Sequence, residues 1–178
     1  KTGSDKSYLV LSSLLAKLRT GEIRSQAAKP ILAASAANAA GDDLETIQLR
    51  AFAGDAATLE QLTLAVLAEG RSTNVRIALL DTVAIVAPTQ LKEPLDQWIQ
   101  QQRASESVDE KWRNALLDAI INRGSESARQ QLLQSVTDLP VGVQATIAER
   151  MSQREATSVL LLDTILSEKL PKDVVSPN

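Results

Sequence analysis

The sequence predicts an all-α fold in which antiparallel helical hairpins follow one another in an α-α superhelix. Apolar residues recur with helical spacing along almost the whole chain of 178 residues. The 7 glycines and 6 prolines fall between apolar stretches, whereas a β-sandwich needs a turn about every 8–12 residues. A near-repeated string, ALLDTVA at 78–84 and ALLDAII at 115–121, indicates internal repetition.

About ten helices are expected, each bounded by a capping side chain, a glycine or a proline. In chain order they occupy approximately residues 5–19, 25–40, 42–54, 55–70, 72–87, 89–103, 105–124, 125 onward, 140–153 and 154–169. The links between them are short, which is typical of antiparallel neighbours. We therefore predict one domain covering residues 1–178.

Capping residues define several of these boundaries. Asp42 or Asp43 is expected to cap the third helix and Gly54 to end it, and Ser125 is expected to cap the eighth. Pro140 suits the first turn of the ninth helix. Pro94 is awkward inside the sixth helix, where it would shift the start of the helix or kink it.

Four apolar residues can be placed in a common repeat register: Ile47, Val75, Trp112 and Val143. Their spacings of 28, 37 and 31 residues suit irregular two-helix repeats. The next residue is polar in every copy, namely Gln48, Arg76, Arg113 and Gln144. Such a hairpin cannot cover its own apolar face, so neighbouring hairpins must stack to bury it.

The first-helix pattern, as in NVRIALLDTVA at 74–84, resembles HEAT repeats of the HEAT/armadillo-like α-solenoids. This resemblance implies a ladder of Arg and acidic residues between neighbouring repeats. The matching residues are Arg76, Arg113, Asp81 and Asp118, whereas Gln48 and Gln144 depart from the pattern.

The carboxyl-terminal segment 154–176 is similar to the HEAT-repeat regions of planctomycete-type membrane-bound dehydrogenase and c-type cytochrome proteins. The resemblance rests on Arg154, Leu161, Leu162, Ile165, Leu170, Pro171 and Asp173. It implies a spacer or docking region of a larger extracytoplasmic redox protein, with the haem and dehydrogenase chemistry outside this segment. The chain begins with Lys1 rather than Met, and we expect it to be a fragment of a larger multidomain protein.

The composition excludes several kinds of site. The chain has no His and no Cys, which excludes Cys/His zinc sites, thiol nucleophiles, Ser–His triads and covalent haem attachment. We therefore predict no catalytic residue, no metal ligand and no cofactor in this segment, which is not an enzyme by itself. An enzyme with a pocket between hairpins remains an alternative, and it would rely on Asp, Glu, Lys or Tyr8.

The expected partner is a protein, either another domain of the parent chain or a separate molecule. The alternative is a HEAT-like nucleic-acid-binding solenoid, which the net charge of −3 and the aromatic content of 2% disfavour. No run reaches the roughly 18 apolar residues of a membrane span, so no membrane insertion is expected. The apolar stretch 8–18 is interpreted as an amphipathic helix rather than a targeting remnant.

The candidate binding surface comprises Trp98, Gln101, Gln102 and Arg103, a composition typical of interaction hot spots. The alternative is a partly buried Trp98 that covers a repeat junction.

Two acidic groups are also interpreted structurally. Asp42, Asp43 and Glu45 are expected to cap a helix rather than bind a metal. Asp81 and Asp118 are expected to form structural ion pairs or to be solvated, rather than to act as a paired-carboxylate acid/base site.

Overall fold

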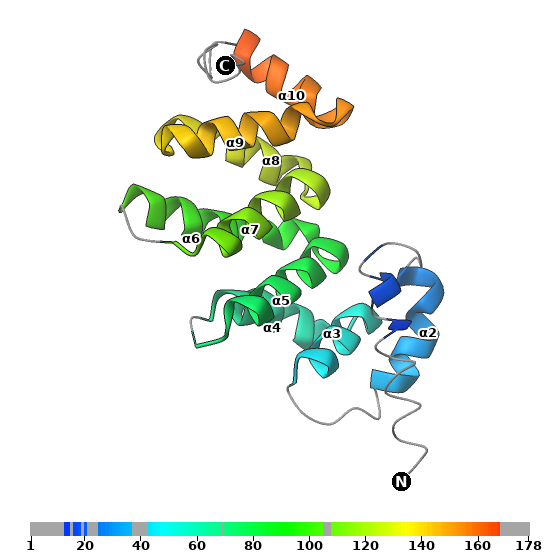
Figure 1. Cartoon of the computed structure of the whole chain (residues 1–178). Helices are drawn as coiled ribbons and strands as arrows, with labels where there is room; N and C mark the ends of the chain where they lie inside the picture. Colours follow the sequence, from blue (N-terminus) through cyan, green and yellow to red (C-terminus); the bar gives the residue numbers. More distant parts are fainter. Residues whose placement is uncertain are drawn as a thin grey trace. The chain divides into compact units, whose positions relative to one another are not determined.

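The structure is a computed structural model, and it describes residues 13–14, 16–18, 20, 25–36, 43–68, 70–104 and 108–167. Within these ranges every regular element is helical and there is no strand, which confirms the prediction of an all-α fold (Figure 1). The named elements are α2 (Ser25–Ala36), α3 (Leu44–Ala53), α4 (Ala56–Leu67), α5 (Thr73–Val86), η1 (Pro88–Leu91), α6 (Lys92–Arg103), α7 (Glu110–Arg123), α8 (Glu126–Ser135), η2 (Val136–Asp138), α9 (Val141–Ser152) and α10 (Glu155–Leu166). The η elements are short 3₁₀-helices.

The chain separates into two compact units, Lys1–Ala87 and Pro88–Asn178. The boundary lies directly after α5, where Pro88 opens η1. We describe each unit by itself, and the prediction of one domain over residues 1–178 stays a prediction.

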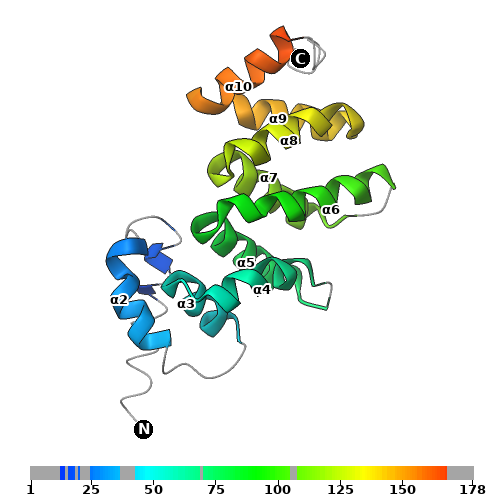
Figure 2. The ribbon, with the colours of Figure 1, turned by 180° about the vertical axis from the view of Figure 1, so that it is seen from behind.

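In the first unit, α3 packs against α2, α4 and α5, and α4 packs against α5. Figure 1 and Figure 2 both show α2 beside α3. The apolar cluster here contains Leu18, Leu32, Leu49 and Phe52, each less than 5% exposed. Ile85 and Val86, at the end of α5, pack against the same cluster. Helices at successive places in the chain thus share one continuous core.

The second unit has the same kind of neighbour packing. Here α6 contacts η1, α7 and α8, while α7 contacts α8 and α9, and α10 contacts α8 and α9. The largest fully buried side chains of this unit are Leu91, Leu95, Trp98, Leu116, Leu117, Ile120 and Ile121. Each α-helix of this unit therefore packs against helices one and two positions away along the chain.

Capping side chains begin and end the helices largely where the sequence predicts. The Asp43 carboxylate accepts the Thr46 amide 3.0 Å away at the start of α3, and Ser125 accepts the Ala128 amide at the start of α8. Gly54 ends α3 with a left-handed φ of 82°, a conformation that disfavours other L-residues. These three boundary predictions are confirmed.

Other boundaries differ from the predicted ones for local reasons. Helix α4 ends at Leu67, before the predicted stop at Gly70, because Ala68 adopts an extended conformation. Pro94 is the third residue of α6, where its missing N–H would have no partner inside the helix. This placement confirms that the proline shifts the helix start. Most of the predicted first helix and the tail 171–178 lie outside the described residues.

The repeated apolar–polar pair occupies the third and fourth residues of α5, α7 and α9, and the fourth and fifth residues of α3. In α5, the Arg76 Nε donates to the Val66 carbonyl of α4 at 2.9 Å. In α9, the Gln144 Nε2 donates to the Leu139 carbonyl at 2.7 Å. The fourth residues of α8 and α10, Arg129 and Ser158, likewise donate to the carbonyls of Ile121 and Met151. A polar side chain at this position thus satisfies a carbonyl at the end of the preceding element.

A polar link joins α3 to α5 in the first unit. The Gln48 Nε2 donates to the Ala78 carbonyl at 3.0 Å and to the Thr82 Oγ1 at 2.9 Å. Both Gln48 and Thr82 are fully buried. Gln48 departs from the Arg of the HEAT pattern, yet it makes the link between neighbouring first helices.

A second link joins α7 to α9 in the other unit. The Arg150 guanidinium donates to the Asn114 carbonyl and side-chain oxygen at 3.0 and 3.1 Å, and to Asp118 at 2.9 Å. Arg113, the residue predicted for such a ladder, forms an ion pair with Glu110 of its own helix at 3.0 Å. Asp118 therefore pairs with a cation of another helix, which lies near the end of α9.

Candidate interaction surfaces

The predicted hot-spot tryptophan lies in the core of the second unit. Trp98 is 1% exposed, and it shares the buried face of α6 with Leu95 and Ile99. These residues follow helical spacing, and Gln101 and Gln102, three and four residues after Trp98, continue the same side of the helix into half-buried positions. Trp98 is more deeply buried than the repeat-junction alternative expects, and it presents no accessible surface to a partner.

The other three predicted residues lie at the end of α6. Gln101 and Gln102 are half-buried, and Arg103 is exposed. Arg103 forms an ion pair with Asp138 of η2 at 2.5 Å, with 47% and 46% of the two side chains exposed. The binding prediction for this patch stays a prediction, and among its four residues only Arg103 is exposed.

The acidic group near residue 43 acts as a helix cap. Thr46 donates to the Asp43 carboxylate from its amide and from its hydroxyl, the latter at 2.9 Å. The hydrogen bond from the Thr46 amide, followed by that from its hydroxyl, lowers the pKa of Asp43. Glu45 lies in the first turn of α3, where a carboxylate is favoured by the helix dipole, and Asp42 lies outside the described residues.

The described residues provide no group of three or more His, Cys, Asp or Glu side chains placed to hold a metal ion. Asp118 is paired with Arg150, as expected for a structural ion pair. Asp81 belongs to the other unit, and the interpretation that these two carboxylates form no acid/base site stays a prediction.

Helix α10 carries an exposed apolar stripe that was not predicted from the sequence. Val159, Leu162 and Leu166 are 53%, 55% and 77% exposed, and their spacing of three and four residues places them on one side of the helix. The opposite side carries Thr157 and Leu161, which are buried. Apolar side chains therefore surround much of α10, a pattern typical of a helix that is covered on more than one side.

A shallow hollow of about 300 Å³ lies between α8 and α10. Gln130 and Gln134 line it from α8, and Asp163 and Thr164 line it from α10. None of the three residues of the apolar stripe lines this hollow.

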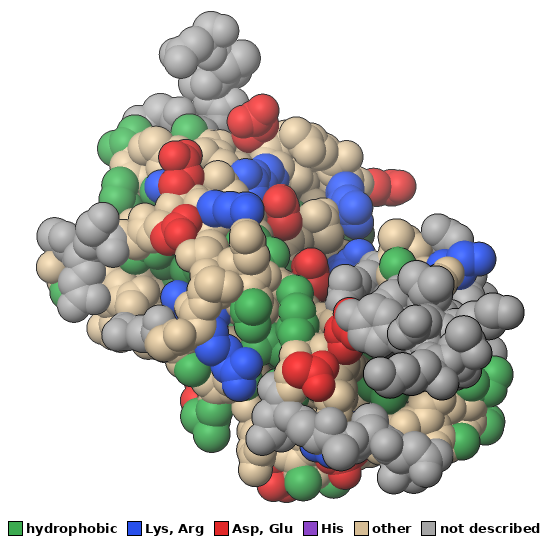
Figure 3. Space-filling view, turned by 60° about the horizontal axis from the view of Figure 1, so that its bottom comes forward, with side chains coloured by type: hydrophobic (Ala, Val, Ile, Leu, Met, Phe, Trp, Pro, Cys, Tyr) green, Lys and Arg blue, Asp and Glu red, His purple; other side chains and the backbone are tan. Residues whose placement is uncertain are grey.

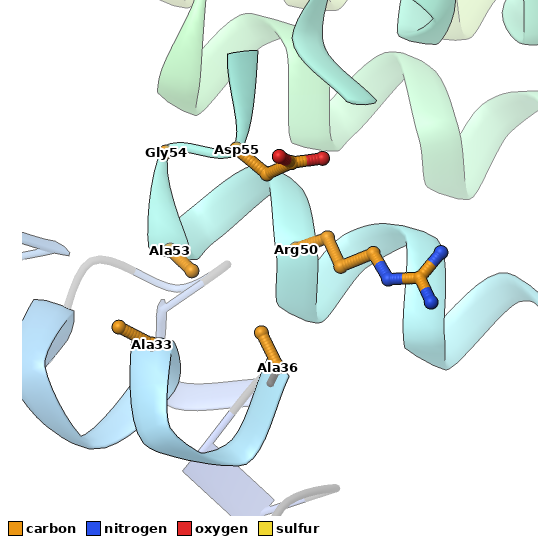
Figure 4. A pocket seen from close by; sticks show the side chains of 6 residues that line it. All are labelled: Ala33, Ala36, Arg50, Ala53, Gly54 and Asp55. Atoms are coloured by element: carbon orange, nitrogen blue, oxygen red, sulfur yellow. The ribbon is translucent and has the colours of Figure 1, made fainter. Parts of the chain in front are cut away.

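The first unit has a hollow of about 500 Å³ between α2 and α3 (Figure 4). Ala33 and Ala36 line it from α2, and Ala53 lines it from α3. Figure 4 shows the Arg50 side chain directed away from these alanines. The walls therefore hold few groups that could orient a ligand.

A second hollow of about 440 Å³ lies between α3, α4 and the turn that precedes α5. Arg50 lines it from α3, and Arg71 lines it from the turn. Leu64, which is 63% exposed, contributes an apolar wall from α4.

Basic and acidic side chains are interspersed on the face drawn in Figure 3, which has no continuous basic stripe. Binding along a nucleic-acid backbone depends on such a stripe. Among the helices described, none combines the length and the hydropathy needed to cross a bilayer.

No protein-family model, curated protein or solved structure matches this chain. The resemblances to HEAT repeats and to the dehydrogenase and cytochrome proteins stay predictions from residue patterns.

Proposed function

We propose that the chain is a non-catalytic scaffold for protein–protein contact or domain spacing, built as a HEAT-like α-solenoid. The neighbour packing inside each unit supports this architecture. The side-chain hydrogen bonds of the α3–α5 and α7–α9 links span 30 to 36 residues, as in Gln48–Ala78 and Arg150–Asn114. These separations fall in the range of the repeat spacings of 28, 37 and 31 residues in the sequence.

The observation that carries the contact role is the apolar stripe on α10. Three large apolar side chains on one helix face are more than half exposed, while the opposite face is packed against α8 and α9. Contiguous exposed apolar surface of this kind marks protein interaction sites. An amphipathic helix that inserts apolar residues at matching spacing would bury it.

The residue content supports a passive role for this segment. With no His and no Cys in the chain, imidazole acid/base groups and thiol nucleophiles are missing. The carboxyl-terminal resemblance favours a parent protein of the extracytoplasmic redox class, in which other domains would hold the haem and the dehydrogenase chemistry.

Site-specific photo-crosslinking in the cells that make the protein tests this proposal. A photoreactive residue at Leu162 should yield a defined protein adduct. The same residue at Glu126, exposed on α8, serves as the control and should not yield that adduct. Equal adducts from both positions, or nucleic-acid adducts from Leu162, would contradict the proposal.

A further inference from the structure

Helices α9 and α10 lie at one end of the second unit, as Figure 1 and Figure 2 both show. In this unit α7 packs against α9, and α8 packs against α10. The positions of α7 and α8 that meet these following helices have equivalents on α9 and α10. The equivalent positions define what the end of the unit offers to a further pair of helices.

Helices α8 and α10 share one register. The fourth residue of each helix donates a side-chain hydrogen bond to a carbonyl of the helix before it: Arg129 donates to Ile121, and Ser158 donates to Met151. Helix α10 also begins 29 residues after α8, the same separation as between these two donors. Residues 29 positions apart are therefore equivalent in the two helices.

The side of α8 that meets α10 carries Gln130 and Leu133, which line the hollow between the two helices. Leu133 is only 2% exposed. At the equivalent positions α10 carries Val159 and Leu162, which belong to the apolar stripe and are more than half exposed. The stripe therefore lies on the side of α10 that corresponds to the covered side of α8.

The contacts with preceding helices agree with this register. Gln131 of α8 donates a hydrogen bond to Asp96 of α6. Its equivalent on α10 is Leu160, which lines the hollow shared with α8. Each of these helices thus uses one side for the helix before it and another side for the helix after it.

The neighbouring helix α9 offers a charged group in its own register. On α7, Asn114 and Asp118 accept hydrogen bonds from Arg150 of α9. Helix α9 begins 31 residues after α7, so the equivalents of these two acceptors are Ala145 and Glu149. Both are exposed. A carboxylate at this position can pair with a basic residue of a further helix, as Asp118 pairs with Arg150.

We propose that a helical hairpin of a partner protein stacks on α9 and α10 as these helices stack on α7 and α8. Its second helix covers Val159, Leu162 and Leu166 with apolar side chains, which removes their surface from water. A basic residue near the end of its first helix pairs with Glu149. This inference rests on the proposed function as a protein-contact scaffold, and it specifies the geometry and chemistry of the partner.

Crosslinks from two positions of the full chain distinguish a helix from an extended segment. An apolar photoreactive residue replaces Val159 in one variant and Leu166 in another, in the cells that make the protein. Mass spectrometry then identifies the modified partner residues. Seven residues of α-helix rise about 10 Å, a distance that an extended strand covers in about three residues. The two adducts should therefore lie about seven residues apart in one partner segment.

Matched variants test the two contacts of the hairpin. Leu162→Ser should lower the adduct yield from Val159 roughly tenfold or more, whereas Leu64→Ser, at an exposed apolar position of the first unit, should not. Glu149→Gln should lower the yield roughly twofold to fivefold, as expected for an exposed ion pair. Glu126→Gln makes the same change in net charge on α8 and should leave the yield unchanged.

Three results would overturn the inference. They are adducts about three residues apart or in separate partner segments, adducts to this chain itself, either in residues 168–178 or in a second copy, and an unchanged yield in Glu149→Gln. A partner-protein adduct at Leu162 beside a spacing of about three residues would reject only this inference. If no protein adduct formed from any position of the stripe, the proposed function would be rejected as well.

Discussion

The two units link their neighbouring first helices by different chemistry. In the first unit, the link between α3 and α5 is neutral and fully buried, and it consists of Gln48, Thr82 and the Ala78 carbonyl. In the second unit, the link between α7 and α9 is ionic and reaches the surface, where the Asp118 side chain is 57% exposed. The comparison shows that two helices one element apart can be linked either by a neutral buried bond or by an ionic bond near the surface.

The difference has energetic consequences. A buried hydrogen bond is expensive to break, because the partner that remains loses both its bond and its water. An exposed ion pair contributes less, because water replaces the lost partner and salt screens the attraction. The predictions below follow this order from the largest effect to the smallest.

Gln48→Ala should lower the free energy of unfolding by about 2–3 kcal/mol, because it leaves a cavity and an unmet hydrogen-bonding group at a buried site. Denaturant unfolding followed by circular dichroism measures this change. Gln61→Ala, at an exposed position of α4, is the control and should change stability by less than about 0.5 kcal/mol. If the two variants lost the same free energy of unfolding, the buried Gln48 link would not contribute to stability as proposed.

Arg150→Ala should lower the free energy of unfolding by about 1–2 kcal/mol, because three hydrogen bonds to α7 are lost at a partly exposed site. Arg154→Ala, exposed at the start of α10, is the control. The difference in the free energy of unfolding between the two variants should become smaller in high salt, since part of the Arg150 link is ionic. If salt did not change this difference, an ionic contribution of Arg150 to stability would be contradicted.

Asp43→Ala should cost about 1 kcal/mol at neutral pH through the loss of the α3 cap. Because folding lowers the pKa of Asp43, its contribution is complete above the unfolded value of about 3.9 and is lost as the pH falls through the folded value. Unfolding curves measured between neutral and strongly acidic pH should therefore converge for the variant and the parent protein at the acidic end. A constant difference across that range would argue against the cap.

Arg103→Gln should change the free energy of unfolding by less than about 1 kcal/mol, because both partners of the Arg103–Asp138 pair are nearly half exposed. The effect should disappear in high salt. A loss comparable to that of Gln48→Ala would mean that α6 depends on this pair far more than its exposure indicates.

Local chemistry made the helices predictable. Asp43, Gly54 and Ser125 act within one turn of their own position, so a short sequence window contains the information that caps need. The end of α4 at Leu67 was not predicted, because glycine is the usual residue after a helix end and the next glycine is Gly70. The chain leaves the helix earlier, at the extended residue Ala68.

The interaction surfaces were harder to predict because they depend on which face of each helix is packed. Trp98 was grouped with its sequence neighbours, but its spacing from Leu95 and Ile99 would have indicated a common buried face. The α10 stripe had a readable pattern in Val159, Leu162 and Leu166, which helical spacing places together. The sequence does not show which side of α10 is exposed. That follows from the packing of α8 and α9 against the opposite face of the helix.

Residues far apart in the sequence form the links between helices, so no local pattern identifies the pairs. Arg113 has the residue type expected for a ladder, yet it pairs within α7. Arg150 replaces it from the end of α9. The cation that meets Asp118 therefore comes from another helix, six residues beyond the register position of Gln144.

Stacking in chain order is the central claim, and distances between α6, α8 and α10 test it most directly. The chain has no Cys, so pairs of spin labels can be placed at Gln100, Gln134 and Asp163 and measured by pulsed electron paramagnetic resonance. Packed helices lie about 8–10 Å apart. The Gln100–Asp163 distance should therefore be the longest, near the sum of the other two. A Gln100–Asp163 distance no longer than the other two would indicate helices arranged around one shared centre, and would contradict the account.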